Sequence, residues 1–513
     1  MGFQEITLQL PTDYTEDLLR SAISKQLGIR EFSYTIESKS LDARKKSNIH
    51  WLIKIGAVAD ALPDISPASQ PVLEIPTLKS PGTALVVGSG PAGIFGALVL
   101  QRAGFRTLLI ERGAKVDKRA SSIKQFESSG VFSTVGNYAF GEGGAGTFSD
   151  GKLTSRTKNI VAEKNFIIES YIRAGAPPEI SYLSHPHLGT DNLRHIVVKL
   201  RREFENLGGE IRFETMLTDL HIDNGRVVGA ATTAGGFDPD VVLIAPGHSA
   251  HETYRMLIER GVQFRTKNFA IGSRIEHPQE LINSAQWGRP ALPGVKAAEY
   301  RLTASEKNCL PVFTFCMCPG GTVVPATAYS DTNIVNGMSR YRRDGRFANA
   351  ACVAGVNLNE LLDKVVSPFE ALDWLGTLEQ KFYQHSSRYQ APFATISGFI
   401  DKKLPKRSSD TSYPLGLDPA PLWDMLPQPV SHSLAHGLKV FSRKLKGFET
   451  GIILGLESKT SSPLQTLRDD SRRCEGFTNL YLAGEGSGWS GGIISSGVDG
   501  IRTAMAIIRN TGT

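Results

Sequence analysis

The sequence is poor in cysteine and has no long uninterrupted apolar run. Its 513 residues include five cysteines, namely Cys309, Cys316, Cys318, Cys352 and Cys474. A low and odd count argues against a disulfide framework and favours a reducing compartment, so we expect a cytoplasmic location. The longest apolar stretch, residues 84–100, is interrupted by glycines and a proline. It therefore predicts a strand followed by a buried helix, and we expect no membrane partner.

An excess of one charge is also missing. Lys and Arg number 57 and Asp and Glu number 51, which gives a net charge of +6. That charge is small for this length, so we expect no nucleic-acid partner. The first ten residues lack a basic segment followed by an apolar core, which argues against a secretory signal. The Cys and His spacings fit no zinc site, and we expect no metal.

The length predicts two or three domains. Residues 1–80 are interpreted as a small N-terminal α+β module. It holds a strand at 5–10, a helix at 15–27 capped by Thr15, and strands at 32–38 and 50–58. We assign 81–254 and 451–513 to one discontinuous α/β domain and 255–450 to an inserted α+β substrate domain. Residues 113–190 look irregular, with a single helix near 163–174.

A glycine-rich turn follows the first strand of the α/β domain. Residues 84–87, 91–103 and 107–110 have the patterns of a strand, a helix and a second strand. The G-x-G-x-x-G motif between them comprises Gly88, Ser89, Gly90, Pro91, Ala92 and Gly93. Its glycines allow a tight turn, close approach of a pyrophosphate and close packing of helix on strand, and the helix N-terminus attracts the phosphate. Glu111 ends the second strand, where an acid binds ribose hydroxyls, and Arg112 follows it. These features predict a Rossmann-like dinucleotide-binding domain.

The motif alone does not distinguish NAD from FAD, but two later segments do. Residues 240–247, ending at Gly247, resemble the strand-plus-ATG segment of two-dinucleotide-fold flavoproteins, with Pro246 in place of threonine. Residues 479–485 resemble the C-terminal strand of those proteins, and the resemblance implies that Gly484 and Glu485 lie at the ribityl chain. It also implies that the backbone of Leu217 contacts the adenine. The expected cofactor is therefore FAD.

A second G-x-G-x-x-G match occurs at 486–491. A second nucleotide domain needs a further strand and acid, and the sequence ends at Thr513 after one helix. We therefore interpret the match as a loop that closes over the flavin. Backbone N–H groups of Gly491, Gly492 and Ile493 would point from a helix start at flavin N1 and O2.

From about Leu41 onward, the sequence resembles the family of uncharacterised FAD-dependent dehydrogenases. The resemblance implies FAD and a fold like that of glutathione-reductase and succinate-dehydrogenase relatives. This sequence has His251-Glu252 where the family has Arg-Asp, and Lys459 where arginine is usual. The motifs that carry the resemblance are residues 40–46, 140–152, 247–250, 269–278, 315–321, 336–339, 457–463 and 484–492.

The segment 140–152 contains five glycines and several polar residues. A flexible surface loop is one interpretation, but its place after the βαβ unit favours contact with FAD. Lys152 would either offset phosphate charge or lie near flavin N5. The residues of this segment expected at the cofactor are Gly143, Thr147, Ser149, Asp150 and Lys152.

Arg274, Glu276 and His277 form the candidate catalytic group. On a strand, Arg274 and Glu276 share a face and His277 points to the opposite one. His277 suits a proton donor in hydride transfer because its reference pKa is near neutral. A hydrogen-bonded structural histidine is an equally good interpretation.

Two further features have alternative interpretations. Cys316 and Cys318 are two residues apart on a strand; they are either a redox dithiol or buried structural cysteines, and we favour the second. The basic stretches 340–343 and 402–407 are interpreted as solvated faces rather than as sites for an NADPH phosphate or an acidic substrate.

These features predict a FAD-dependent oxidoreductase that transfers a hydride between a small-molecule substrate and flavin N5. Because no second complete Rossmann unit is present, NAD(P)H as electron donor would bind only transiently, near the flavin. The alternative is a non-catalytic FAD-bound redox sensor or scaffold that docks RNA or protein through the N-terminal module.

Overall fold

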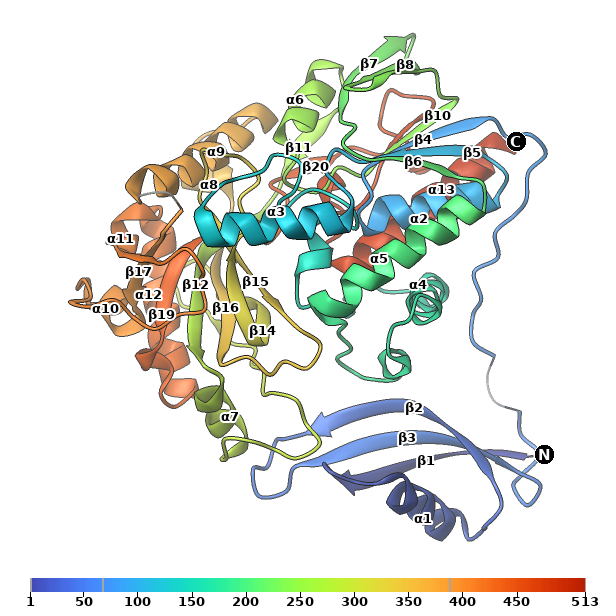
Figure 1. The fold of residues 1–513 in the computed structure, drawn as a ribbon, viewed down its shortest axis with the longest axis vertical. Helices are drawn as coiled ribbons and strands as arrows, with labels where there is room; N and C mark the ends of the chain where they lie inside the picture. Colours follow the sequence, from blue (N-terminus) through green and yellow to red (C-terminus); the bar gives the residue numbers. More distant parts are fainter. Residues whose placement is uncertain (1, 67–68, 387–388, 513) are drawn as a thin grey trace.

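The start of the chain folds into a three-stranded antiparallel sheet with one helix against it (Figure 1). The structure, a computed structural model, describes residues 2–66, 69–386 and 389–512. The sheet order is β1-β3-β2, and the Thr15 hydroxyl accepts a hydrogen bond from the Leu18 backbone N–H at the start of the helix. The elements are β1 (Gly2–Pro11), α1 (Glu16–Leu27), β2 (Ser33–Asp42) and β3 (His50–Ala59).

A five-stranded parallel sheet forms the Rossmann-like domain. Its order is β21-β10-β4-β5-β6, so strands more than two hundred residues apart in sequence lie side by side. Helix α2 connects β4 to β5 and completes the expected βαβ unit. The sheet and the helices that accompany it are β4 (Thr83–Val87), α2 (Pro91–Arg102), β5 (Arg106–Ile110), α4 (Val161–Arg173), α5 (Gly189–Asn206), β6 (Glu210–Arg212), β10 (Val241–Ile244), β21 (Leu480–Leu482) and α13 (Ile493–Thr511).

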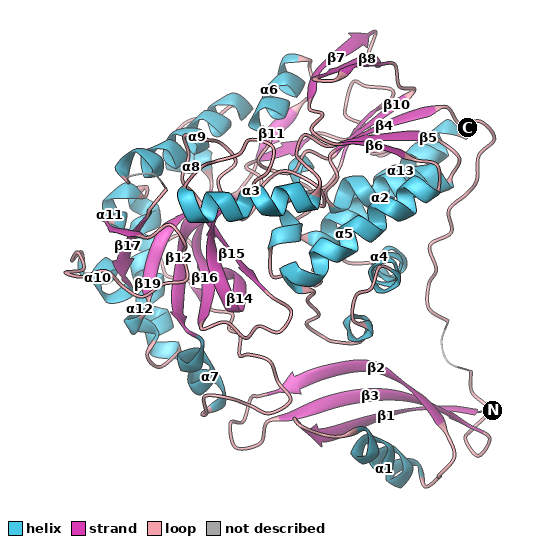
Figure 2. Ribbon diagram, in the orientation of Figure 1, coloured by secondary structure: helices cyan, strands magenta, loops and turns pink. Residues whose placement is uncertain are grey.

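The two faces of this sheet are covered differently, as the alternation of side chains along β4 shows. Ala84 and Val86 pack against α2, α4, α5 and α13, whereas Leu85 and Val87 face a three-stranded meander and α6. Figures 1 and 2 show helices on one side of the sheet and the meander on the other. The covering elements of the second face are β7 (Leu217–Asp223), β8 (Arg226–Thr232), β9 (Gly235–Phe237) and α6 (His251–Glu259).

A second, mostly antiparallel sheet has eight strands in the order β13-β14-β16-β12-β19-β17-β18, with β15 also paired to β14. Helices α9 and α12 help to cover one of its faces. A two-stranded ribbon of β11 and β20 lies beside it. The strands are β11 (Phe264–Thr266), β12 (Phe269–Pro278), β13 (Thr303–Ala304), β14 (Val312–Pro325), β15 (Val335–Ser339), β16 (Phe347–Val356), β17 (Ala391–Thr395), β18 (Leu417–Pro419), β19 (Ile452–Glu457) and β20 (Leu464–Thr466). The helices are α7 (Gln279–Trp287), α8 (Leu358–Leu361), α9 (Pro368–His385), α10 (Ile396–Asp401), α11 (Leu422–Met425) and α12 (Gln428–Lys444).

One expected boundary is wrong. The sequence analysis placed residues from 451 onward in the α/β domain, but β19 pairs with β12 and β17 inside the eight-stranded sheet. All residues of β19 are buried, so the strand has the continuous apolar sequence that is also typical of strands in a parallel sheet. The chain therefore returns to the parallel sheet only after the ribbon strand β20.

A second correction concerns the region that looked irregular. Residues Val116–Ser129 form a 14-residue helix, α3, ended by Gly130 in the left-handed conformation. Its inward positions are Val116, Arg119, Ile123 and Phe126, which have helical spacing. A buried arginine at one of these positions hid the pattern.

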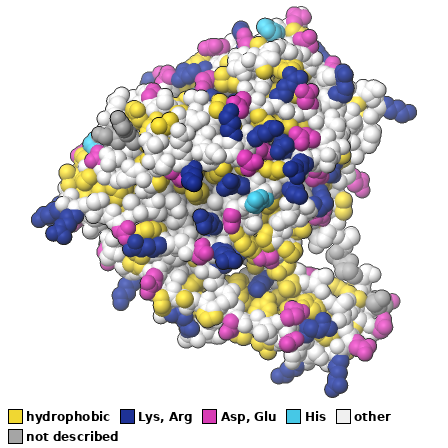
Figure 3. Space-filling view, in the orientation of Figure 1, with side chains coloured by type: hydrophobic (Ala, Val, Ile, Leu, Met, Phe, Trp, Pro, Cys, Tyr) yellow, Lys and Arg dark blue, Asp and Glu magenta, His cyan; other side chains and the backbone are white. Residues whose placement is uncertain are grey.

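Charged side chains are mixed over the surface. On the face shown in Figure 3, Lys and Arg alternate with Asp and Glu and form no continuous basic patch. Among residues 2–66, 69–386 and 389–512, no helix has the length and apolar character needed to cross a membrane.

Candidate cofactor site

The turn after β4 is built so tightly that side chains do not fit. Gly88 has a φ of 96°, and a Cβ on it would lie 2.3 Å from the Ala245 carbonyl oxygen. A Cβ on Gly93 would lie 1.7 Å from the Gly88 oxygen. Gly90 and Pro91 begin α2, and no side chain caps the first N–H groups of that helix. The turn therefore presents free backbone donors at the positive end of a helix dipole, which suits a pyrophosphate.

Glu111 braces this turn from the end of β5. Its carboxylate accepts hydrogen bonds from Ser89 N at 2.9 Å, Ser89 Oγ at 2.8 Å, Gly113 N at 2.8 Å and Gly141 N at 3.1 Å. Of these four donors, only the Ser89 hydroxyl can rotate away, and it would leave a place for a ribose hydroxyl.

Arg112, also expected at the cofactor, packs against Phe140 and pairs with Glu252. Its guanidinium carbon lies 3.9 Å from the centre of the Phe140 ring, and its nitrogens pair with Glu252 at 3.2 Å. The sequence pattern could not show this, because the partner Glu252 is remote in sequence.

The glycine-rich segment 140–148 lies directly on the turn. A Cβ on Gly144 would lie 2.9 Å from Gly90 Cα, so the two backbones touch. Thr147 is buried, and its hydroxyl donates to the Glu142 carbonyl at 3.2 Å. A pocket lies in this region, bordered among others by Ser89, Pro91, Gly143, Thr147 and Ile493. The dinucleotide turn, the glycine-rich segment and the start of α13 therefore meet around one space.

Arg119 of α3 orders this segment, and sequence reasoning missed it. The side chain is fully buried. Its guanidinium donates to the backbone carbonyls of Asn137 at 2.8 Å, Tyr138 at 3.0 Å, Glu142 at 3.0 Å and Gly144 at 2.8 Å. One cation thus holds four backbone carbonyls between Asn137 and Gly144 in place.

The other half of the space is lined by bare glycines around one acid. Gly247 and Gly492 have φ values of 68° and 78°, and a Cβ on either would meet no atom of the described chain within 4 Å. A Cβ on Gly491 would lie 3.6 Å from Glu485 Oε1. The three glycines therefore face open space beside Glu485.

Glu485 is the exception among the carboxylates of this region. Among the described residues it makes no hydrogen bond through its side chain, and its nearest ionic contact is His248 Nε2 at 3.9 Å. Burial raises the pKa of Glu485 to about 8, against a lowering effect of Lys267. A largely buried acid without a partner is costly unless a ligand satisfies it, so the site fits the ribityl hydroxyls of FAD.

The start of α13 reaches the site because α13 crosses α2 at a backbone contact. A Cβ on Gly500 would lie 2.0 Å from the Ala92 carbonyl oxygen, and one on Gly484 would lie 2.7 Å from Ala92 Cβ. Gly492 precedes Ile493 at the helix start, where no side chain caps the N–H groups. Leu217, the adenine contact implied by the resemblance, begins β7 and is buried.

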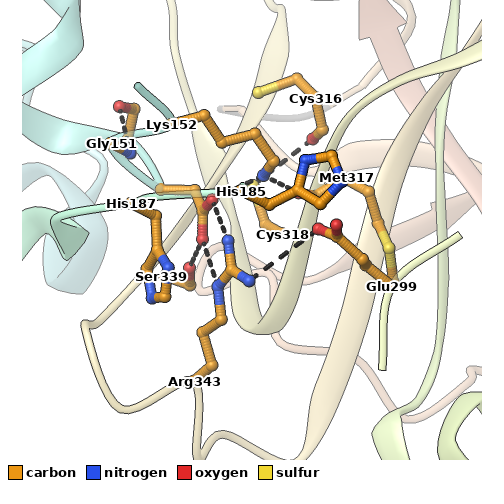
Figure 4. A network of polar contacts seen from close by, with 12 residues as sticks. Gly151, Lys152, His185, His187, Glu299, Cys316, Met317, Cys318, Ser339 and Arg343 are labelled. Carbon is orange, nitrogen blue, oxygen red and sulfur yellow. Dashed lines mark hydrogen bonds and ion pairs between the residues drawn. The ribbon is translucent and has the colours of Figure 1, made fainter. Parts of the chain in front are cut away.

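Asp150 and Lys152, both expected at the cofactor, pair with each other in a network that also includes Arg343 (Figure 4). The expected place of Lys152, at the phosphate or near flavin N5, stays a prediction. Asp150 is buried and accepts hydrogen bonds from Arg343 Nε at 3.1 Å, Arg343 Nη2 at 2.7 Å and the Ser339 hydroxyl. Lys152 Nζ pairs with Asp150 at 2.5 Å and donates to the Met317 carbonyl. Ser149 donates to the Gly146 carbonyl at 2.7 Å.

Arg343 corrects another expectation, because it belongs to a stretch interpreted as a solvated face. It is only 8% exposed and has a φ of 53°. Burial raises the pKa of Asp150, but Lys152 and Arg343 outweigh that effect and lower it strongly. The buried acid is therefore charged and neutralised by two cations.

Of the three candidate catalytic residues, only Arg274 joins a polar cluster near the cofactor space. Arg274 and Glu276 point to the same face of β12 and His277 to the other, as the strand alternation predicts. Glu276 accepts hydrogen bonds from Thr411 at 2.7 Å and from the Ser412 N–H at 3.1 Å. It therefore anchors a loop rather than facing a substrate.

His277 does not suit a proton donor. It is buried against the Phe448 ring, with 4.7 Å between ring centres, and its Nε2 donates to the Phe448 carbonyl at 2.7 Å. Burial lowers the pKa of His277 to about 4, so the ring is neutral at neutral pH. The structure supports the structural interpretation of this histidine.

Two residues that depart from the family pattern touch each other. Lys459 Nζ lies 3.2 Å from His251 Nε2 and pairs with Glu379 at 2.8 Å. His248, which the sequence analysis did not single out, donates through Nε2 to the Lys459 carbonyl at 2.9 Å. Burial, followed by the charge of Lys459, lowers the pKa of His248 to about 3. Two of the departures from the family pattern, at His251 and Lys459, are therefore in direct contact.

Comparison with known proteins gives three matching families along the chain. Residues 3–57 match a domain of unknown function, residues 82–232 an FAD-binding domain, and residues 268–460 the family described as FAD-dependent protein, C-terminal domain-like. An uncharacterized protein of Clostridium beijerinckii is 37% identical over 531 residues, covering 99% of each chain. The cofactor is therefore FAD.

Similarity to solved structures is much weaker. The flavin-dependent brominase Bmp2 has a TM-score of 0.38 and 14% identity, over 84% of this chain and 79% of that one. Glycine oxidase from Bacillus cereus has a TM-score of 0.31 and 11% identity, over 83% and 94%. These values carry no argument about activity, and the likeness to glutathione reductase and succinate dehydrogenase stays a prediction. Within the described ranges, no three His, Cys, Asp or Glu side chains are grouped to hold a metal ion.

Proposed function

Because this chain belongs to one family with the Clostridium beijerinckii homologue and carries an FAD-binding domain, we propose that it is an oxidoreductase that transfers a hydride between a small-molecule substrate and FAD N5. The flavin supplies the hydride chemistry, and the protein supplies position, electrostatics and exclusion of water. NAD(P)H is proposed only as a transient electron donor, since the described chain has one parallel nucleotide-binding sheet.

The observation that carries the proposal is Glu485, an acid without a hydrogen-bond partner among the described residues, next to glycines that leave space for a ligand. The largely buried Glu485 lies next to Gly491, and Gly247 and Gly492 leave room for a flat ligand. The uncapped start of α13 adds free N–H donors to the same space. Donors at a helix start stabilise negative charge, which is the charge that a reduced flavin acquires near N1 and O2.

The other half of the cofactor would lie along the first turn. The uncapped N–H groups at the start of α2, which follows Gly90, suit the diphosphate, and Ser89 with Glu111 suits the adenosine ribose. The protein residues that touch these positions are already ordered by Arg119 and by the Glu111 hydrogen bonds.

The proposed activity is tested on the purified protein with its bound cofactor. Under anaerobic conditions, the visible absorbance of oxidised flavin should bleach on addition of NADH, NADPH or a reducing metabolite, and should recover in air. A protein that binds FAD but never bleaches in a broad anaerobic screen would refute hydride transfer and favour the redox sensor or scaffold.

The role of Glu485 has its own test. Glu485→Gln keeps the shape but removes the acid, and loss of one such hydrogen bond should weaken FAD binding by about 2–10-fold. The measurement is the rate at which flavin fluorescence appears as FAD leaves the protein. The exposed Glu475→Gln is the matched control and should release FAD at the wild-type rate. Equal release from the two variants contradicts the placement of FAD beside Glu485.

A further inference from the structure

The two cysteines of β14 lie at a break in the strand rather than in regular structure. Phe315 pairs with Ala351 and Cys318 with Asn349, so β14 has one residue more than β16 between these pairs. Such an extra residue is a β-bulge, a device that re-aims side chains and is common next to active sites. Cys316 and Cys318 therefore do not follow the regular alternation that would place them on one face of the strand.

The backbone at Cys316 is strained. Its φ is 44°, and it is the one described non-glycine residue with positive φ that lies inside a named strand. A left-handed conformation is costly for a cysteine and persists only when surrounding contacts impose it. Strain of this kind concentrates at functional sites.

Arg274 and Lys152 hold the backbone around Cys316 through hydrogen bonds to two successive carbonyls. Arg274 Nη2 donates to the Cys316 carbonyl at 2.6 Å and lies 3.6 Å from Cys318 Sγ. Lys152 donates to the carbonyl of Met317, the residue between the cysteines. Figure 4 shows Lys152, Cys316, Met317 and Cys318 at one end of the polar network. Both cations therefore lie beside the Cys316–Cys318 segment, and each is also paired with a buried carboxylate.

The two thiols differ in accessibility and environment. Cys318 is buried, and its Sγ–H lies 3.4 Å from the Cys316 carbonyl oxygen, so its side chain turns back toward Cys316. Cys316 is partly exposed, and the preceding Phe315 is 46% exposed, which shows that the surface here is open. A reagent in solvent can thus reach the Cys316 thiol, whereas the Cys318 thiol is enclosed by the protein.

We propose that Cys316 and Cys318 form a thiol–disulfide exchange site whose substrates are disulfides. Cys316 is the attacking thiolate and Cys318 the resolving thiol. This role goes beyond hydride transfer and needs only the two cysteines and their surroundings.

The reaction balances in two steps. The Cys316 thiolate attacks one sulfur of the external disulfide, forms a mixed disulfide and releases the first thiolate. Cys318 then loses its proton and attacks Cys316 Sγ, which closes an internal disulfide and releases the second thiol. The external disulfide gains two electrons, and the cysteine pair loses two.

The charges around Cys316 favour this division of roles. Hydrogen bonding with Cys318 is the largest cause that lowers the pKa of Cys316, to about 5; burial opposes it, and Lys152 and Arg274 add to it. The same pairing and burial raise the pKa of Cys318. The acids whose charges interact with Cys316 are Asp150, Glu457 and Glu485.

The interaction with Glu485 places the thiol pair in the electrostatic neighbourhood of the cofactor site. Regenerating the Cys316 thiolate and the Cys318 thiol takes two electrons and one proton, which the anionic reduced FAD can supply; this link, unlike the exchange itself, rests on the proposed function. An anaerobic reductive titration tests it. The oxidised wild type should consume two electrons per chain more than a Cys318→Ser variant before its flavin is fully reduced, and equal consumption overturns the link alone.

The exchange itself is tested without any flavin readout. Full-length protein with FAD, in a Cys309→Ser background, is reduced, desalted and treated with oxidised glutathione; this background matters because Cys309 lies in the same tryptic peptide. Mass spectrometry should find an internal Cys316–Cys318 disulfide without retained glutathione. Cys318→Ser should instead trap glutathione on Cys316, and Cys316→Ser should show neither product. An unchanged flavin spectrum shows that each variant is folded.

The pH dependence separates this site from an ordinary thiol. A thiol with an unperturbed pKa should react about 75-fold faster with an aromatic disulfide at about pH 8 than at about pH 6, because its thiolate fraction rises. Cys316 is expected to change less than about threefold over that range. Glutathione on neither cysteine, or on Cys309 alone in a chain that retains it, together with an ordinary pH profile, overturns the proposal.

Discussion

Replacing Arg274 by methionine should destabilise the eight-stranded sheet strongly. Arg274 is 0% exposed and donates to Asn349 at 2.8 Å, Asn336 at 3.0 Å and Glu457 at 2.6 Å. Methionine fills the space of the stem but leaves the Glu457 carboxylate buried without its cation. Removing one partner of a buried ion pair costs about 3–5 kcal/mol. For a cooperative unit of this domain's size, that cost lowers the melting temperature by roughly 6–20 °C.

The double variant identifies the cause. In Arg274→Met with Glu457→Gln, no charge is left unpaired, so most of the lost melting temperature should return. The assay is thermal unfolding of the FAD-bound protein, followed by circular dichroism and by flavin release. If the single and double variants lose the same amount, the cost comes from lost packing or neutral hydrogen bonds and the reasoning about charge is refuted.

The cost should also depend on pH. Burial raises the pKa of Glu457 to about 7, although Arg274 lowers it. A carboxyl group with a raised folded-state pKa contributes stability that is complete at low pH and is lost as pH rises through that pKa. Without Arg274 the pKa of Glu457 should rise further, so the carboxyl is neutral in mildly acidic buffer. The difference in melting temperature between wild type and Arg274→Met should therefore widen from about pH 6 to about pH 8.5.

Two further substitutions test other parts of the structure, both by thermal unfolding. Gly500→Ala places a Cβ 2.0 Å from the Ala92 carbonyl oxygen and should lower the free energy of unfolding by about 1–3 kcal/mol, with faster loss of FAD. The control Gly376→Ala in α9 meets nothing within 4 Å and should raise the free energy of unfolding by about 1 kcal/mol. Equal effects of the two substitutions contradict the backbone contact of α2 and α13. Asp150→Asn leaves Arg343 and Lys152 without their acid and should cost about 3–5 kcal/mol. Because the pKa of Asp150 is lowered on folding, the stability difference between wild type and Asp150→Asn should be constant above about pH 5 and should narrow as pH falls below about 4. A stability difference that widens in acid would count against the ion pair.

The local patterns of the chain predicted most of the architecture. The strand–turn–helix–strand unit around Gly88 has a periodicity and glycine spacing that few other structures tolerate, and the structure has it. The Thr15 cap and the helix beginning at Ile493 are equally local signals. What failed depended on partners remote in sequence. Arg119 was not singled out and Arg343 was assigned to a solvated face, because the carbonyls and the acid that surround them come from other segments.

The candidate site divides in the same way. Glycines in motifs and an acid at the end of a strand are recognisable in the sequence, and in the structure Gly247, Gly492 and Glu485 lie around one space. The face of a strand residue is predictable, but what covers that face is not, so His277 lies under Phe448 rather than toward a substrate. The bulge at Cys316 is invisible to a rule of strict alternation.

The hydrogen bonds of Arg119 to the glycine-rich segment affect the entropy cost of binding the cofactor. A loop with this much glycine would normally lose a large conformational entropy on ordering. Here a side chain of α3 has already fixed the carbonyls of four loop residues from behind. In the proposed position, FAD would therefore meet a loop that Arg119 already holds, and the free energy of its contacts would go into affinity rather than into ordering the loop.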